Sequence, residues 1–206
     1  MKKQENNNRF FKAILITVLS LVTFLLVAAI IIVIDRYKTS SYKIDVRFNT
    51  SSVVQLTNKL PISDSIGKNY MGSGIEKGIA EYIEFTVSNP NKKKVKYEVY
   101  LTRDANISNN IRSNYIKLYL TDNKNNPLDG FKTKRIKSYY DLYVFNNKPG
   151  SKLLYTGTLG AGKTKHLILR SWVADTYVLS DKEETFGFSV SVRIKEEWYN
   201  GFKKFK

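Results

Sequence analysis

The chain has 206 residues, no cysteine and a formal net charge of +16, with 34 Lys and Arg against 18 Asp and Glu. The absence of cysteine excludes a disulfide framework, a thiolate metal site and a cysteine nucleophile. A charge balance of this sign predicts attraction to polyanions such as nucleic acid, anionic lipid or acidic wall polymers.

The first predicted element is a transmembrane helix over residues 13–34, from Ala13 to Ile34, which contain no charged side chain. At ~1.5 Å per residue this run reaches ~33 Å, which matches a hydrocarbon core of ~30 Å. The apolar part of a signal peptide is shorter, ~7–15 residues, and ends at a small-x-small cleavage site. This run ends in Val33-Ile34-Asp35-Arg36 instead, so we expect an uncleaved anchor, with a removed signal peptide as the alternative.

The charges that precede the helix predict its orientation. Residues 1–12 carry four bases and one acid, so the positive-inside rule places this segment in the cytoplasm and the long C-terminal part outside. The predicted organisation is a basic cytoplasmic N-terminus (1–12), the transmembrane helix (13–34), a short polar stalk (35–42), an extracytoplasmic domain (43–195) and an aromatic-basic tail (196–206). The protein is therefore expected to be a single-pass cell-membrane protein.

Apolar residues of the outer part alternate with polar ones, which is typical of half-buried strands. The expected strands, in chain order, are 44–48, 82–87, 95–101, 116–120, 140–145, 153–158, 165–173 and 186–194. The turn signal Ser88-Asn89-Pro90-Asn91 predicts that the second and third strands form a hairpin. Eight or nine short strands with Gly, Asn, Asp or Pro clusters between them predict an all-β fold, an Ig-like or jelly-roll-type antiparallel sandwich. Residues 61–78 are expected to be its longest irregular connection.

One segment matches the phosphate-binding P-loop pattern residue for residue, from Gly157 to Gly162-Lys163-Thr164. That loop functions only between a buried parallel strand and a helix whose N-terminus faces the phosphates. The residues that follow, 165–173, alternate as a strand does and lack the signals of a helix start. The glycines therefore favour a hairpin turn over a nucleotide site.

No set of residues predicts catalysis, a cofactor or a metal site. His166 is the only histidine, and no Gly-x-Ser-x-Gly nucleophile motif accompanies it. A zinc site would have to rely on carboxylates, because the chain offers one histidine and no cysteine. We expect the protein not to be an enzyme.

Basic residues give the candidate binding sites. The candidates for polyanion binding are Lys92, Lys93, Lys94, Lys132, Lys134, Arg135 and Lys137. In the tail, the candidates for contact with a membrane surface are Trp198, Phe202, Lys203, Lys204 and Phe205. The alternative interpretations are a solvated strand-and-loop face for the first set and a tail packed on the domain for the second.

Three stretches resemble the TasA/camelysin-like β-sandwich surface proteins of low-GC Gram-positive bacteria. They are Phe85–Asn89 continuing to Lys96–Leu101, Leu154–Leu159 leading into Gly162, and Leu169–Asp175. The resemblance implies a secreted or anchored sandwich, and in some members assembly into extracellular fibres. It supplies no catalytic residues.

The expected function is binding or scaffolding at the cell envelope, through the positive surface against an acidic wall polymer or lipid. The alternative is a subunit that assembles through edge strands into a fibre or envelope complex, with other envelope proteins or further copies as partners. An envelope hydrolase is the least favoured class. Nucleic acid is not expected as a partner, because the domain is predicted to lie outside the cell.

Overall fold

The computed structural model describes residues 2–40, 42–71, 78–133, 135–144 and 150–195. The chain forms two units, a long N-terminal helix and a β-domain that begins at Lys43. Helix α1 spans Lys2–Ser40, so the expected stalk is helical as far as Ser40.

Helix α1 contains one segment, Ile14–Ile34, that is long and apolar enough to cross a membrane, and none of it is buried. The Thr23 hydroxyl donates to the carbonyl oxygen of Leu19 at 2.8 Å and approaches that of Ser20 at 3.0 Å. Its polar group is therefore satisfied within its own helix, as a hydroxyl in lipid requires.

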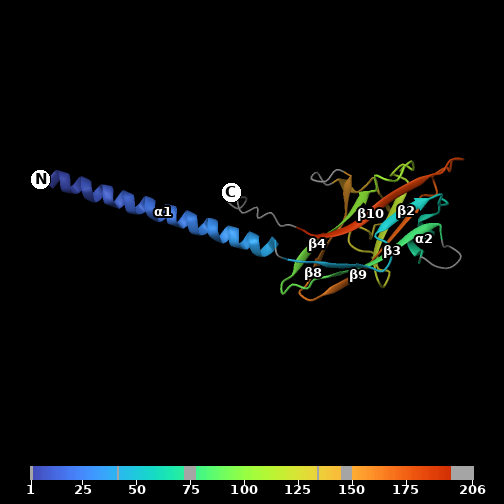
Figure 1. Cartoon of the computed structure of the whole chain (residues 1–206), viewed down its shortest axis with the longest axis horizontal. Helices are drawn as coiled ribbons and strands as arrows, with labels where there is room; N and C mark the ends of the chain where they lie inside the picture. Colours follow the sequence, from blue (N-terminus) through green and yellow to red (C-terminus); the bar gives the residue numbers. More distant parts are fainter. Residues whose placement is uncertain (1, 41, 72–77, 134, 145–149, 196–206) are drawn as a thin grey trace. The chain divides into compact units, whose positions relative to one another are not determined.

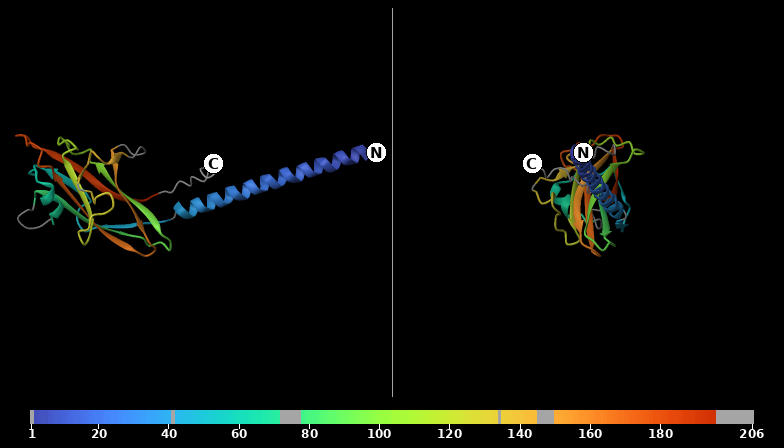
Figure 2. Two further views of the ribbon diagram at one scale, coloured as in Figure 1. Left: turned by 180° about the vertical axis from the view of Figure 1, so that it is seen from behind. Right: turned by 90° about the vertical axis from the view of Figure 1, so that its left-hand side faces the viewer.

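The β-domain consists of two five-stranded antiparallel sheets, and the prediction of an all-β sandwich after one apolar helix is confirmed (Figure 1). The first sheet has the order β1-β3-β9-β5-β6 and the second the order β2-β10-β4-β8-β7. Figure 2 shows the same domain from two further sides. The strands are β1 (Asp45–Phe48), β2 (Val53–Thr57), β3 (Ala80–Ser88), β4 (Val95–Arg103), β5 (Ile116–Asp122), β6 (Lys137–Ser138), β7 (Tyr143–Val144), β8 (Ser151–Leu159), β9 (Thr164–Val173) and β10 (Thr185–Ile194).

The described residues contain ten strands, rather than eight or nine. The additional elements are β2 and the two-residue strand β6, each at the edge of its sheet. Only Val54 and Leu56 of β2 are buried, and two residues are too few to show an alternating pattern at β6 or β7. The strand expected over 140–145 is reduced to Tyr143–Val144 among the residues described there.

The predicted hairpin between residues 82–87 and 95–101 is wrong. Strand β3 pairs with β1 and β9 in the first sheet, whereas β4 pairs with β10 and β8 in the second. Residues 89–94 therefore connect the two sheets. The same is true of residues 160–163, which carry the chain from β8 in the second sheet to β9 in the first.

The main core lies between the sheets and is rich in aromatic side chains. Phe85 of β3 and Phe186 and Phe188 of β10 are fully buried, and Tyr139 packs with its ring centroid 5.1 Å from that of Phe186. Since the chain has no cysteine, this apolar burial must supply the stability that disulfides give to many exported domains.

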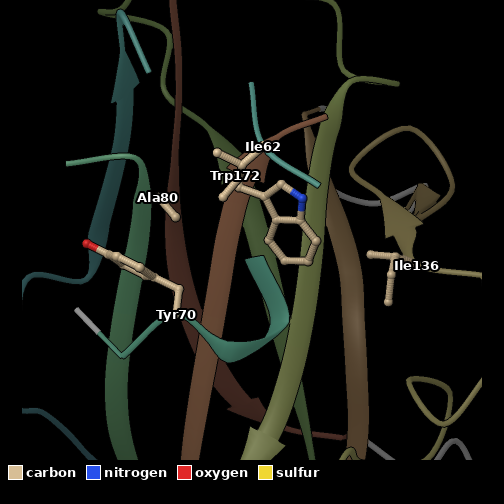
Figure 3. Packing of buried hydrophobic residues seen from close by; sticks show 5 residues of the cluster. All are labelled: Ile62, Tyr70, Ala80, Ile136 and Trp172. Carbon is tan, nitrogen blue, oxygen red and sulfur yellow. The ribbon is translucent and has the colours of Figure 1, made fainter. Parts of the chain in front are cut away.

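A second, smaller core lies on the outer face of the first sheet. It contains Trp172 of β9 and Ala80 of β3, covered by Ile62 and Tyr70 from the segment that includes α2 (Asp64–Asn69). Figure 3 shows the indole of Trp172 beside the α2 ribbon, with Ile136 approaching from another segment. The long connection predicted over residues 61–78 thus contains a short helix, and in its described part it covers the sheet.

The same cover buries a charge. His166, Ile168, Arg170 and Trp172 share one face of β9, as their alternation predicts, but Arg170 is completely buried. Its Nε donates to the Tyr70 carbonyl at 2.6 Å and its Nη1 to the Thr121 hydroxyl at 3.0 Å. Burial lowers the pKa of Arg170. The first of these hydrogen bonds joins the covering segment to β9, and the second joins β9 to β5 of the same sheet.

Candidate polyanion-binding surface

One end of the sandwich is formed by the loops 89–94 and 160–163, and we call it the base. Figures 1 and 2 show the green 89–94 loop next to the orange 160–163 loop. Strands β3 and β8 end here, and β4 and β9 begin here. The two loops are far apart in the sequence, so the contacts that hold them together determine which side chains the base presents.

Asn89 is the centre of these contacts and is 1% exposed. Its Nδ2 lies 2.9 Å from the Lys93 carbonyl oxygen, 3.0 Å from that of Leu159 and 2.8 Å from that of Gly160. Its backbone N–H donates to the Lys163 carbonyl at 2.9 Å, and its own carbonyl accepts from Gly162 N–H at 2.9 Å. A buried amide with all its groups bonded fixes the two loops as one structure.

Asn91 extends this network to the beginning of the β-domain. Its Nδ2 donates to the Lys43 carbonyl at 2.6 Å, and its Oδ1 accepts from the Lys43 N–H at 3.2 Å. It also donates to Oδ1 of Asn89 at 2.7 Å. Two asparagines therefore hold three separate parts of the chain together.

These three parts each contribute lysines, which we call the base lysines. They are Lys43, Lys92, Lys93, Lys94 and Lys163. All five are exposed, and none forms an ion pair with any residue that the structure describes. Five positive charges without an ion-pair partner in the described part of the chain repel one another, and an anion bound between them would relieve that repulsion.

In the second predicted basic group, residues 132–137, two of the basic side chains have acidic partners. Lys132 Nζ lies 2.6 Å from Asp129 Oδ1, and Arg135 Nη2 lies 3.1 Å from Asp141 Oδ1. The hydrogen bond to Asp129 raises the pKa of Lys132, and the same bond lowers the pKa of Asp129.

Lys137 of this group lies 4.9 Å from the centre of the Phe131 ring. Lys134 lies outside the described residues. The structure thus separates the predicted candidates into lysines 92–94, which have no acidic partner in the described part of the chain, and Lys132 and Arg135, which have one.

The P-loop pattern occupies the end of β8 and the loop into β9, and each of its ends has a structural explanation. A Cβ atom at Gly157 would overlap the ring of Tyr97. Gly162 has a φ of 64°, a backbone conformation that favours glycine. Thr164 begins a strand and its hydroxyl lies 2.8 Å from that of Ser88. Strand β9 follows the loop, so the loop lacks the helix N-terminus that a P-loop places against the phosphates. The hairpin predicted here is wrong, since the loop crosses between the sheets.

His166 lies beside this loop on the outer face of the first sheet, in a groove of about 550 Å³. The other lining residues include Asp45, Arg47, Thr86 and Ser88. In the described part of the chain, no group of three His, Asp or Glu side chains is close enough to hold a metal ion. The residues that line the groove include no Phe, Tyr or Trp side chain on which a sugar ring could stack.

The membrane-contact candidates of the tail, from Trp198 to Phe205, fall outside the described residues. Sequence reasoning missed Lys43 and Lys163 as members of the basic surface. Lys163 stood out only as part of the P-loop pattern, and Lys43 directly precedes the strand expected over 44–48 without any sign that it joins the other lysines. The available signal was the pair Asn89 and Asn91, which marked a turn but gave no indication of the other segments it bonds to.

Comparison of the sequence with protein-family models and with curated proteins found no match.

Proposed function

We propose that this protein is a single-pass membrane protein that displays its β-sandwich outside the cytoplasm and binds polyanions there without catalysing a reaction. The observation that carries the proposal is the set of five exposed base lysines, held together by Asn89 and Asn91 and lacking acidic partners in the described part of the chain. Charge of one sign on a rigid surface attracts chains of the opposite sign.

The orientation rests on residues 1–12, where four bases and one acid precede the membrane segment. The remainder of the chain then carries 30 bases and 17 acids, so an excess of +13 faces outward. An acidic wall polymer and anionic lipid share the chemistry that such a surface recognises, namely repeated phosphate or carboxylate groups.

The test compares two triple variants of the full chain in detergent micelles, with long-chain polyphosphate as the probe. Changing Lys92, Lys93 and Lys94 to Gln should weaken binding by about tenfold or more, since each removed contact also removes released counterions. The matched control changes Lys132, Arg135 and Lys137 to Gln, and should weaken binding by less than about threefold, because Asp129 and Asp141 already compensate two of these charges.

Binding by the unmodified chain should also fall steeply between about 50 and 200 mM salt. Equal losses of polyphosphate affinity in the two variants, or an affinity that does not change with salt concentration, would contradict the proposal.

A second candidate function is assembly through added strands, as the resemblance to fibre-forming sandwiches implies. Strand β7 pairs only with Leu153 and Lys152 of β8. Residues 155–159 of β8 therefore have no neighbouring strand on that side among the described residues, which gives an incoming strand an edge to join. Assembly of this kind forms backbone hydrogen bonds, so light scattering by purified protein would grow with concentration and respond little to salt.

A further inference from the structure

The base lysines lie at the end of the sandwich that includes Lys43, the first residue of the β-domain. The apolar segment ends at Ile34 and α1 continues to Ser40, which adds six residues or ~9 Å of helix. Three further residues reach Lys43, which adds at most ~11 Å. Whatever the direction of either part, the covalent chain keeps Lys43 within ~20 Å of the hydrocarbon boundary, and the polar headgroups fill ~5–7 Å of that distance.

The hydrogen bonds of Asn89 and Asn91 apply a similar distance limit to the other base lysines. The Lys43 backbone is bonded to the Asn91 side chain at both its N–H and its C=O. Asn91 is bonded to Asn89, which is bonded to Lys93 and Lys163. The base therefore moves with Lys43 and cannot swing away from the membrane independently.

We infer that the base lysines bind the anionic lipid headgroups of the membrane that holds α1, an inference that rests on the proposed function and names its ligand. Lysines near an anionic leaflet are attracted to it within a Debye length of ~8–10 Å. The tether holds the base at high effective concentration above the lipid, an advantage that no soluble polymer shares.

Binding of the base to lipid would determine which end of the sandwich faces away from the membrane. Strand β9 leads from the base loop to Val173, and its ten residues span ~33 Å. With the base on the lipid, the loop 174–184 that follows β9 is displayed away from the membrane. Ala161 in the base loop is exposed, and Val178 in the distant loop is 85% exposed, so the two positions report on opposite ends.

The experiment uses the full chain in nanodiscs of phosphatidylcholine alone or with about one third phosphatidylglycerol. Because the chain has no cysteine, Ala161→Cys and Val178→Cys each accept a single donor dye, and a lipid carries the acceptor. In anionic discs we expect energy transfer to rise at position 161 and to fall at position 178, and both changes to vanish in high salt. Lys92→Gln, Lys93→Gln and Lys94→Gln together should abolish them, whereas the control triple at Lys132, Arg135 and Lys137 should not.

Unchanged transfer in anionic discs, or a rise at both positions, would overturn the inference. The same variants, prepared in detergent micelles, are tested with polyphosphate. If polyphosphate still binds in a lysine-dependent manner, the lipid assignment alone fails and the proposed function stands. If polyphosphate binding is also absent, both fail.

Discussion

A Cβ atom added at Gly157 would overlap the Tyr97 ring, whereas one added at Gly160 would lie 3.4 Å from Lys163 Cγ, an ordinary contact. Both glycines lie in the segment that matches the P-loop pattern, but only the first is required by packing. Tyr97 is fully buried on β4, which pairs with β8, so the ring has no free space into which it can move.

Gly157→Ala should therefore lower the free energy of unfolding by about 1–3 kcal/mol, the usual cost of overpacking a dense core. Gly160→Ala is the matched control and should change it by less than about 0.5 kcal/mol. Urea unfolding followed by circular dichroism measures both. Loss of nucleotide binding without loss of stability in Gly157→Ala would instead support the rejected P-loop interpretation.

Two buried tyrosines predict sensitivity to alkaline pH. The hydroxyls of Tyr97 and Tyr139 have no hydrogen-bond partner among the described residues. Burial raises the pKa of Tyr139 from 10.0 to about 12, although Arg103 opposes the shift, and burial raises the pKa of Tyr97 further. A raised pKa stabilises the fold at pH values below the unfolded pKa, and this stabilisation is lost as the pH rises through the folded pKa. The free energy of unfolding should therefore fall between about pH 10 and pH 12.

Tyr139→Phe isolates this effect. At neutral pH the variant should be as stable as the unmodified chain or slightly more stable, since the removed hydroxyl makes no hydrogen bond to the described residues. Above pH 10 its stability should fall less steeply. Tyr143→Phe, at a side chain that is 66% exposed, is the control and should follow the unmodified chain. Identical pH curves for Tyr139→Phe and the unmodified chain would contradict the assignment.

At the scale of elements, the alternation of apolar residues identifies most strands but not their partners. Phe85 and Val87 alternate as clearly as Val95 and Tyr97, and the Asn-Pro turn between them suggests a hairpin. The period of a strand indicates which residues face the core, but no local pattern states which sheet a strand joins, because pairing is decided by contacts far along the chain.

The same reason limits what the sequence reveals of the candidate surface. Lys92, Lys93 and Lys94 form a run that any reading of the charges will find. Their association with Lys43 and Lys163 depends on hydrogen bonds from Asn89 to residues about 70 positions later, which no spacing rule anticipates.

The short helix α2 offers a prediction of its own. A Cβ atom at Gly67 would overlap the indole of Trp172, so Gly67→Ala should displace α2 from the sheet. Trp172 would then leave a fully buried environment, and its fluorescence should shift to longer wavelength and become accessible to iodide. The measurement needs a Trp198→Phe background, which leaves Trp172 as the only tryptophan.

Ile66→Ala is the control on the same helix, because Ile66 is 42% exposed and its truncation adds no atoms near the indole. It should leave the emission maximum of Trp172 unchanged. If Gly67→Ala also leaves the emission maximum of Trp172 unchanged, the added Cβ atom does not displace α2 and the prediction is wrong.

At the scale of the whole molecule, charge and hydropathy divide the chain into an apolar segment and a much longer positively charged part. The 21 residues Ile14–Ile34 carry no charge and suit lipid, while residues 35–206 carry most of the excess of positive charge. Positive charge lies on both sides of the helix. Because long domains cross the membrane largely regardless of their charge, the charge of the short leading segment should determine the orientation.

The lack of native cysteine allows the topology to be tested directly with single introduced cysteines. In intact cells, a membrane-impermeant maleimide should label Val178→Cys, which lies on an exposed loop of the sandwich. Asn6→Cys, in the leading segment, should be labelled only after the membrane is permeabilised. The reverse pattern would place the base lysines in the cytoplasm, where nucleic acid and the inner leaflet would be the polyanions within reach. Labelling of both positions in intact cells would instead require that the leading segment also lies outside, and would remove the basis for treating Ile14–Ile34 as a membrane-crossing anchor.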